Sequence, residues 1–338
     1  MRLGKKIIII FIIAVAIIGT FFYIYNQIYF SHGTRNSNKI FNIEKGEGNT
    51  AIAKNLKSEG IISNKIYFWL YLKSHNLMNK IYPGAYLLSG NLTIPEVATL
   101  ITNPQKAFVS VTFPEGWTAK QMANRLDEKG FNGKAFLNLV NDPPKDIISQ
   151  FSIFSDKPES ASLEGYLFPD TYNFSKDATP EGILKKILNN TELKMNDDIK
   201  NEIAIQKKSI FQILTMASII EKEVSTIEDF KIVSGIFWKR IADGRNLQSC
   251  ATLAYILGVN KAQYTYEDTQ VESPYNTYKY KGLPPGPISN PGINTIHATL
   301  NPEKTNYNYF LTDPKNPKNT VYSATFEQHV ANKLKFGL

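Results

Sequence analysis

Two glutamates in one predicted helix are the residues best suited to acid–base chemistry. Residues 210–226, IFQILTMASIIEKEVST, carry apolar side chains at helical spacing. With successive side chains about 100° apart, Glu221 and Glu223 fall on the two borders of the apolar arc, and Lys222 points toward solvent. A carboxyl group beside apolar neighbours loses hydration, which raises its pKa and suits it to act as a general acid. The spacing leaves open which glutamate is the acid, and it also allows both to be border residues paired with a nearby lysine.

A second candidate cluster combines acids with aromatic rings in residues 162–174, SLEGYLFPDTYNF. Glu164 and Asp170 flank a run of four aromatic residues, and Pro169 argues against one continuous helix. Aromatic faces stack on the C–H surfaces of sugars, and carboxylates accept hydrogen bonds from sugar hydroxyls. The cluster therefore suits a sugar site, although an ordinary strand and turn with a buried tyrosine has the same pattern.

A proline-rich segment offers a third group of candidates. Residues 273–292, SPYNTYKYKGLPPGPISNPG, contain five prolines and three glycines, which exclude regular structure. Prolines also rigidify a loop and so lower the entropy cost of ordering a site. Tyr275, Asn276 and Thr277 are the candidate binding residues, and a linker is the alternative interpretation.

The fourth group lies in residues 237–258, FWKRIADGRNLQSCATLAYILG, which read as a helix, a glycine turn, a polar stretch and a second helix. Gln248 and Ser249, in the polar stretch, could reach into a site. Cys250 is not favoured as a nucleophile because no histidine lies in its segment to activate it.

Composition limits the classes of partner. The 338 residues have a formal charge of +8 and contain one cysteine and four scattered histidines. This excludes an intrachain disulfide and a cysteine-based zinc site, and no metal site is expected. The positive charge indicates an anionic neighbour, which could be a membrane, a wall polymer or nucleic acid.

The N-terminus narrows that choice. Residues 7–25, IIIIFIIAVAIIGTFFYIY, are uncharged and long enough to span a bilayer as a helix. We expect an uncleaved anchor over residues 7–28, because the run is longer than a signal peptide's apolar region and is followed by aromatics instead of a small-residue cleavage site. Arg2, Lys5 and Lys6 predict that residues 1–6 are cytoplasmic and that the rest of this single-pass chain is extracytoplasmic, where nucleic acid is not an expected partner.

An internal repeat predicts a small module after a polar linker at residues 29–39. FNIEKGEGNTAIAKNLKSEGII, from Phe41, aligns without gaps to VTFPEGWTAKQMANRLDEKGF, from Val111, so that Gly46 matches Gly116 and Gly60 matches Gly130. Each copy reads as a strand, a glycine turn and a helix with a C-terminal glycine. Residues 40–105 could thus form a subdomain that resembles the lysin-motif modules that bind wall glycan, and residues 106–338 a larger second domain.

Several long motifs, in order, resemble the YceG-like family of endolytic murein transglycosylases, known as MltG. The matching stretches are VTFPEGWTAKQMANRL, LEGYLFPDTY, ASIIEKE, LQS, SPYNTY, GLPPGPISNPG and TFEQH. The resemblance implies an α+β fold with a transmembrane helix, a lysin-motif-like subdomain and a catalytic domain. It assigns the catalytic acid to the first glutamate of ASIIEKE, Glu221, and places the motifs around Glu164, Gln248 and Tyr275–Thr277 in the same cleft. One departure is Cys250-Ala251, where the family usually has Asp-Pro.

The implied reaction cuts the MurNAc–GlcNAc β-1,4 bond within peptidoglycan strands. Glu221 would protonate the glycosidic oxygen and then accept the proton of the C6 hydroxyl that attacks C1, which leaves a 1,6-anhydro-MurNAc end without a cofactor. The implied partners are peptidoglycan glycan, the cytoplasmic membrane and the glycan polymerases of wall synthesis, and the implied role is to terminate glycan elongation. A non-catalytic, membrane-anchored glycan-binding scaffold and a hydrolase that consumes water are the competing interpretations.

Overall fold

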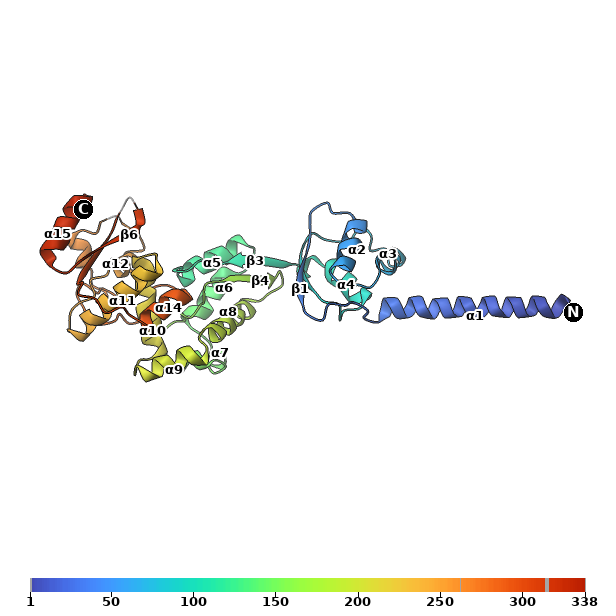
Figure 1. Cartoon of the computed structure of the whole chain (residues 1–338), viewed down its shortest axis with the longest axis horizontal. Coiled ribbons are helices and arrows are strands. Elements are labelled where there is room, and N and C mark those ends of the chain that lie inside the picture. Colours follow the sequence, from blue (N-terminus) through green and yellow to red (C-terminus); the bar gives the residue numbers. More distant parts are fainter. Residues whose placement is uncertain (1, 262, 314–315, 338) are drawn as a thin grey trace. The chain divides into compact units, whose positions relative to one another are not determined.

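The chain folds into two compact units of mixed helix and sheet, as the α+β prediction requires (Figure 1). The structure is a computed structural model that describes residues 2–261, 263–313 and 316–337. Unit 1 consists of Met1–Ser110 with Asn173–Ala178, and unit 2 consists of Val111–Tyr172 with Thr179–Leu338.

The chain begins with a long apolar helix, α1 (Arg2–Tyr29). Its stretch Ile7–Tyr29 contains 18 consecutive residues with a mean hydropathy of 3.0, none of them buried inside the protein, so the stretch is long and apolar enough to cross a bilayer. This fits the predicted single-pass anchor. The side chains of Arg2, Lys5 and Lys6 lie outside the described part of the structure, and the orientation that they predict stays a prediction.

The rest of unit 1 is a small α+β module. Its elements are β1 (Lys39–Ile43), α2 (Asn49–Ser58), α3 (Lys65–Ser74), β2 (Gly84–Leu88), α4 (Ile94–Ile101) and η1 (Pro104–Lys106). β1 and β2 pair antiparallel with Phe41 opposite Tyr86, and the helices bury Leu56, Phe68 and Val97 against them. α4 starts with a capping box, because the Thr93 side chain accepts from the Glu96 amide and the Glu96 side chain accepts from the Thr93 amide.

The segment predicted as a polar linker, residues 29–39, is held against this module. The Gly33 amide donates to the Gly90 carbonyl at 3.2 Å, and the amides of Thr34 and Arg35 both donate to the Gly60 carbonyl. A Cβ atom on Gly33 would lie 2.3 Å from the Gly90 Cα, so only glycine permits this backbone contact. The segment therefore fixes the end of α1 to the module.

Two strands carry the chain out of unit 1 and back: β3 (Phe108–Thr112) and β4 (Thr171–Ser175). They complete a sheet of order β1-β2-β3-β4. The predicted repeat is confirmed, since β1–α2 and β3–α5 (Ala119–Glu128) have the same strand–turn–helix form. The matched glycines Gly46 and Gly116 both have left-handed φ angles, of 87° and 73°, which explains why glycine recurs there.

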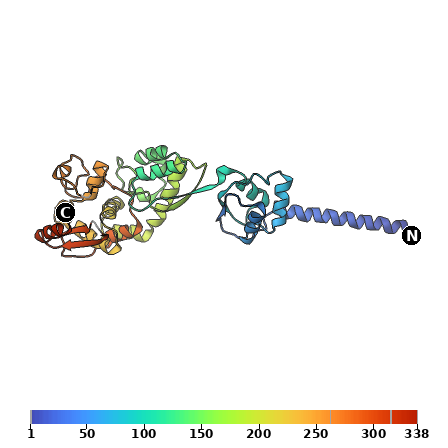
Figure 2. The ribbon, with the colours of Figure 1, turned by 90° about the horizontal axis from the view of Figure 1, so that it is seen from above.

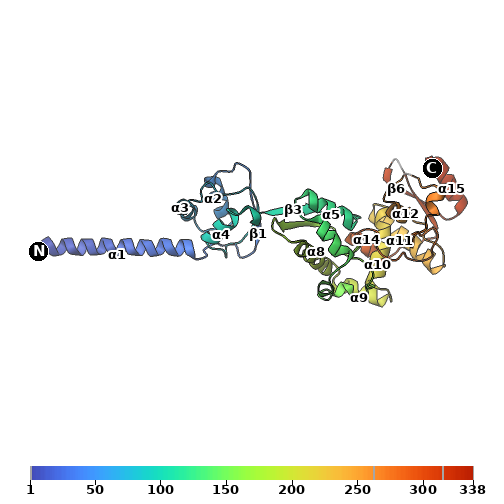
Figure 3. The same cartoon turned by 180° about the vertical axis from the view of Figure 1, so that it is seen from behind.

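Unit 2 is built around one buried helix, α10 (Ile210–Glu223). Figures 1 and 3 show α10 with α11 (Ile227–Ala242), α12 (Cys250–Leu257) and α14 (Ile293–Leu300) beside it. The other elements of unit 2, besides α5, are α6 (Gly133–Asn141), α7 (Lys145–Ile148), η2 (Ser152–Phe154), α8 (Pro180–Lys194), α9 (Asp197–Ile205), α13 (Tyr266–Thr269), β5 (Tyr309–Asp313), β6 (Asn316–Ser323) and α15 (Phe326–Phe336). Met216, Ile219 and Ile220 of α10 pack with Phe237 and Leu247 in one apolar core.

Two peripheral parts of unit 2 flank this core. Figure 2 shows the segment after α12, in orange, and the β5–β6 hairpin with α15, in red, as separate lobes. β5 and β6 pair antiparallel, and the Thr320 hydroxyl donates to the Asp229 carboxylate in the first turn of α11 at 3.1 Å. The hairpin is thereby attached to the core helices that carry the predicted site.

We expect Phe68→Ala to destabilise unit 1 by about 3–5 kcal/mol, because it leaves a cavity where a fully buried ring packs against the sheet. Hydrogen exchange measured by mass spectrometry on the full chain would show lost protection in peptides of unit 1. The control Leu87→Ala removes a side chain exposed on β2 and should change little. Equal loss of protection in unit 2 would contradict separate cores.

Candidate active site

Glu221 lies near the C-terminal end of α10, partly buried, with its carboxylate at the N-terminus of α14. Its Oε2 accepts from the Gly292 amide at 3.0 Å and from the Thr295 hydroxyl at 2.6 Å. Burial raises the pKa of Glu221, these two hydrogen bonds oppose the rise, and the nearby Glu115 carboxylate adds to it. Among the described residues, Oε1 has no hydrogen-bond partner, so one oxygen is held and the other is available to hold or donate a proton.

The turn after β3 packs directly on Glu221. Gly116 has a φ of +73°, and a Cβ there would lie 3.3 Å from both Glu221 Cγ and Lys222 Cδ. The Lys222 Nζ donates to the Gly116 carbonyl at 3.2 Å, and the Glu115 carboxylate lies against Gly292. The motif PEGW therefore forms one wall of the site, and Glu115, which was not among the predicted residues, supplies a second carboxylate nearby.

Glu223 has a different environment, although it is only two residues away. Its Oε1 accepts from the Ser249 hydroxyl and, at 3.1 Å, from the Ala251 amide at the start of α12. Burial raises its pKa, whereas these hydrogen bonds and Arg240 act against the rise. Glu223 thus caps α12 and ties it to α10. Within the described residues, neither glutamate forms a salt bridge with a lysine, and the hydrogen bonds of both are to backbone amides and hydroxyl groups.

Glu164 is a buried carboxylate at the N-terminus of α5. Both of its oxygens lie 3.0 Å from the Ala119 amide, and Oε1 also accepts from the Asn290 side-chain amide at 2.7 Å. Burial raises the pKa of Glu164 to about 7 against these hydrogen bonds. The side chain is thus enclosed by protein groups and is not directed into solvent.

Asn290 joins three loops through its side-chain amide and its backbone. Its Oδ1 accepts from the amides of Gly165 and Leu167, and its Nδ2 donates to the Trp117 carbonyl and to Glu164. Its backbone accepts from Gly116 and donates to Trp117. Asn290 lies in the motif GLPPGPISNPG and was not among the predicted site residues. Its place before a proline in a glycine-rich loop is the signal that could have indicated a role.

The predicted residues of the third and fourth groups lie together, and three of them are buried. The Gln248 amide donates to the Thr277 carbonyl, and the Ser249 amide donates to the Thr277 hydroxyl, both at 3.0 Å. Asn276 donates to the carbonyls of Thr269 and Val271 and accepts from an amide two residues on. Ser249 and Thr277 therefore join the two loops, and Asn276 fixes the proline-rich loop to the end of α13.

Gln248 and Tyr275 differ from these three residues because solvent reaches their side chains. Gln248 is exposed and adopts a φ of 52°, which is uncommon for a residue with a side chain. Tyr275 is half-buried, and its ring centroid lies 5.1 Å from that of Tyr255. Tyr255 and Tyr275 both lie close enough to Glu164 for its charge to raise their pKa values, after burial as the larger cause. These aromatic rings adjoin the Glu164 cluster.

Cys250 is unsuited to nucleophilic chemistry, as the sequence predicted. Although Cys250 is exposed as a residue, loss of hydration at its thiol and the neighbouring Glu223 raise the pKa of the thiol to about 11, and its Sγ lies 3.2 Å from the Tyr278 hydroxyl. The thiol is therefore protonated near neutral pH.

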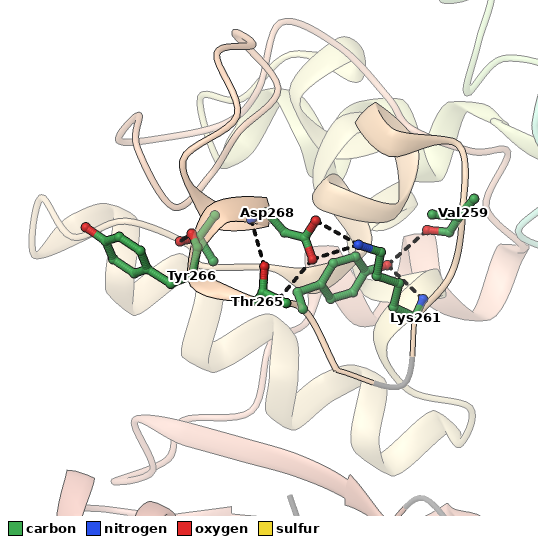
Figure 4. A network of polar contacts seen from close by, with 7 residues as sticks. Val259, Lys261, Thr265, Tyr266 and Asp268 are labelled. Carbon is green, nitrogen blue, oxygen red and sulfur yellow. Dashed lines mark hydrogen bonds and ion pairs between the residues drawn. The ribbon is translucent and has the colours of Figure 1, made fainter.

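A local network joins residues 259–261 to residues 264–268, between α12 and the proline-rich loop (Figure 4). The Lys261 Nζ lies 2.8 Å from both oxygens of Asp268, and Thr265 caps the short helix α13 by accepting from the Asp268 amide. Figure 4 shows the Tyr266 side chain pointing away from this network, and it is among the most exposed aromatic residues.

One hollow lies away from the predicted residues. A hollow of about 680 Å³ lies between α6 and α8, lined by residues such as Asn138, Asp142 and Glu181. Within residues 2–261, 263–313 and 316–337, no three His, Cys, Asp or Glu side chains are grouped closely enough to hold a metal ion. The site is thus defined by the contacts around Glu221.

Comparisons with known proteins show which family the chain resembles. The model of the YceG-like family matches residues 41–335. The endolytic murein transglycosylase of Bacillus subtilis is 32% identical over 307 residues, which cover 87% of this chain and 84% of the relative. The endolytic murein transglycosylase of Streptococcus pneumoniae strain D39 is 28% identical, and the aligned part covers 88% of this chain but 58% of that longer protein.

A solved structure agrees as well. The 2.6 Å crystal structure of a YceG-like protein from Listeria monocytogenes has a TM-score of 0.60 and 33% identity to this chain, and the match covers 87% of this chain and 98% of that one. A match over 87% of the chain must include parts of both units. The chain belongs to the YceG-like family.

We expect Thr295→Val to raise the pKa of Glu221 further, because it removes a hydroxyl that hydrogen-bonds the charged form. Carbon-13 NMR of labelled glutamate carboxyls, with the Glu221→Gln spectrum for assignment, measures this pKa. The matched control is Thr299→Val, which removes a hydroxyl that bonds only to the Thr295 carbonyl within α14. An unchanged Glu221 titration in Thr295→Val would contradict the contact.

Glu164 should make unfolding depend on pH. Because its pKa is about 7 in the folded chain and about 4.5 in the unfolded chain, the folded state binds the proton more tightly between these values. The free energy of unfolding should therefore fall as pH rises from about 4.5 to about 7, by up to about 3 kcal/mol from this group. Urea unfolding in a Trp69→Phe background, which leaves the emission of Trp117 and Trp238 in unit 2, should show a flatter pH profile for Glu164→Gln. If the unfolding free energy depends on pH equally with and without Glu164→Gln, the assignment of this pH dependence to Glu164 is refuted.

Proposed function

We propose that this chain is an endolytic murein transglycosylase that is anchored to the membrane by α1. The observation that carries the proposal is the Glu221 carboxyl, which is partly buried, has a raised pKa and has one oxygen without a partner among the described residues. The relatives at 32% and 28% identity that bear this enzyme name support the choice of murein glycan as substrate.

In the proposed reaction Glu221 acts first as an acid and then as a base. Its proton passes to the leaving glycosidic oxygen as the bond from that oxygen to C1 of MurNAc breaks. The Glu221 carboxylate then takes the proton of the C6 hydroxyl as that oxygen bonds to C1, so the 1,6-anhydro product forms and no water is consumed. The raised pKa supports the first step, since the acid must be protonated near neutral pH. Gly292 and Thr295 stabilise the carboxylate that the first step creates.

The other predicted residues divide by exposure. Gln248 and Tyr275 are the ones we propose to contact the glycan, because their side chains reach solvent. Glu164, Ser249, Asn276 and Thr277 are buried and hydrogen-bonded to protein groups, so we propose that they hold the loops that bind substrate.

Topology and partners follow from the anchor. The cationic residues Arg2, Lys5 and Lys6 support a cytoplasmic N-terminus and an extracytoplasmic catalytic unit. The module of residues 40–105 is proposed to bind glycan as lysin-motif modules do. Attachment to the membrane suits action on nascent strands beside the glycan polymerases, where cleavage would terminate elongation.

Products distinguish this function from its competitors. The detergent-solubilised full chain should release glycan with 1,6-anhydro-MurNAc ends from purified murein, as measured by mass spectrometry. Glu221→Gln should lower the yield by about 100-fold or more, in the range expected for loss of a general acid. The comparison variant Glu223→Gln should keep most activity, because its amide oxygen can still accept from Ala251.

Each alternative predicts a different result. Reducing ends in place of anhydro ends would indicate a hydrolase that consumes water. Binding to murein without product release would indicate a glycan-binding scaffold, and equal anhydro yields from Glu221→Gln and the unmodified chain would remove Glu221 from its role.

A further inference from the structure

Helix α3 carries an exposed apolar stripe that the fold of unit 1 does not use. Ile66, Trp69 and Leu70 are 61%, 40% and 38% exposed, and they share one helix face because they are spaced three and four residues apart. Lys73 extends the same face, with its Nζ 4.8 Å from the centre of the Trp69 ring. The opposite face buries Phe68 in the core of unit 1, so the stripe is available for another contact.

A third face of α3 packs on the last turns of α1. The Tyr67 ring lies 6.4 Å from Tyr23, and the Tyr71 ring lies 6.3 Å from Tyr29. Tyr23 and Tyr29 belong to the apolar stretch Ile7–Tyr29, so α3 contacts the span at its aromatic end. Figures 1 and 3 show α1 running across the page with α3 seen nearly end-on, so the two helix axes cross.

The junction between the two helices is fixed on several sides. Ile28 of α1 is buried in the core of unit 1, and the Ser63 hydroxyl donates to Gln27 at 3.2 Å. The backbone bonds of residues 33–35 to Gly60 and Gly90 hold the connection after α1. Because α1 cannot tilt freely away from α3, a bilayer that contains α1 must also approach the stripe.

The charge around α3 matches an anionic lipid surface. Residues 60–95 contain Lys65, Lys73 and Lys80 and no acidic residue. Lysine side chains beside apolar and aromatic residues suit the membrane interface, since the stem packs on hydrocarbon while the ammonium group reaches the headgroups. A tryptophan in the same stripe is typical of interfacial anchoring.

We propose that α3 lies in the interfacial layer of the bilayer that α1 spans, with Ile66, Trp69 and Leu70 in contact with lipid. Unit 1 then has two membrane contacts, a span and an amphipathic helix that lies across it. The second contact fixes the orientation of unit 1 on the surface. This inference depends on α1 being a membrane span and not on glycan cleavage.

The test uses nitroxide labels on the full chain in nanodiscs of phosphatidylcholine and phosphatidylglycerol. Cys250→Ser removes the native thiol, and single cysteines are then introduced as Leu70→Cys on the stripe, Phe22→Cys on α1 and Asn42→Cys on β1. Asn42 is the matched control, because it is exposed in the same unit and β1 lies on the side away from α1 in Figure 1. Thermal unfolding checks that each labelled chain is folded, and electron paramagnetic resonance measures accessibility to oxygen and to a water-soluble nickel chelate.

The Leu70 label should resemble the Phe22 label, with a ratio of oxygen to nickel accessibility several-fold above that of the Asn42 label. Nickel accessibility at Leu70 equal to that at Asn42 would overturn the proposal. The Leu70 label could also be shielded from the nickel chelate by a second copy of the chain. If that shielding disappears when each nanodisc holds a single chain, a second copy covers the stripe, and the proposal is likewise overturned. Labelled chains that also carry Glu221→Gln should show the same oxygen and nickel accessibilities as labelled chains with an unmodified catalytic unit. The result is therefore independent of enzymatic activity.

Discussion

The arrangement of unit 2 depends on the hydrogen bonds of one buried amide, that of Asn290. Its two donors and its oxygen are all used, and its backbone adds two further bonds to the PEGW turn. A buried polar group contributes to specificity only when its bonds are complete, because an unpaired one costs about 1–3 kcal/mol. Two residues later the same loop presents the Gly292 amide to Glu221, so the loops that surround the acid are fixed by the residue that satisfies Glu164.

Three glutamates in this unit use the same interaction for different purposes. Glu164, Glu221 and Glu223 each accept from an amide at the N-terminus of a helix, where the helix dipole favours negative charge. Burial raises the pKa of all three, so burial alone does not distinguish them. What distinguishes Glu221 is geometry. Its held oxygen orients the carboxyl, and within the described structure its second oxygen is not engaged, whereas Glu164 is enclosed and Glu223 caps α12.

The local elements could be predicted from the sequence, and the long-range pairings could not. Helical periodicity, the Thr93 cap and the repeated glycines at positions 46 and 116 are consequences of neighbouring residues, and all are present. Asn290 and Glu164 are 126 residues apart, and no spacing rule relates them. The same holds for Thr295, which meets Glu221 only because α14 begins against α10. Exposure of the predicted binding residues could not be predicted either, because all of them carry polar groups. Only the packing of the two loops leaves Gln248 and Tyr275 accessible to solvent and buries Ser249, Asn276 and Thr277.

The departure at Cys250-Ala251 has a physical consequence at Glu223 and not at Glu221. The Ala251 amide donates to Glu223, and a proline at this position, which the resemblance makes usual, has no N–H to donate. An aspartate at position 250 would add negative charge beside Glu223, whereas the thiol there is protonated. Compared with a chain that has Asp-Pro at these two positions, this chain gives the buried Glu223 one more backbone hydrogen-bond donor and places one fewer negative charge beside it. The contacts of Glu221 with Gly292 and Thr295 come from a different loop, so the substitution alters how α12 is capped and leaves the proposed acid in place.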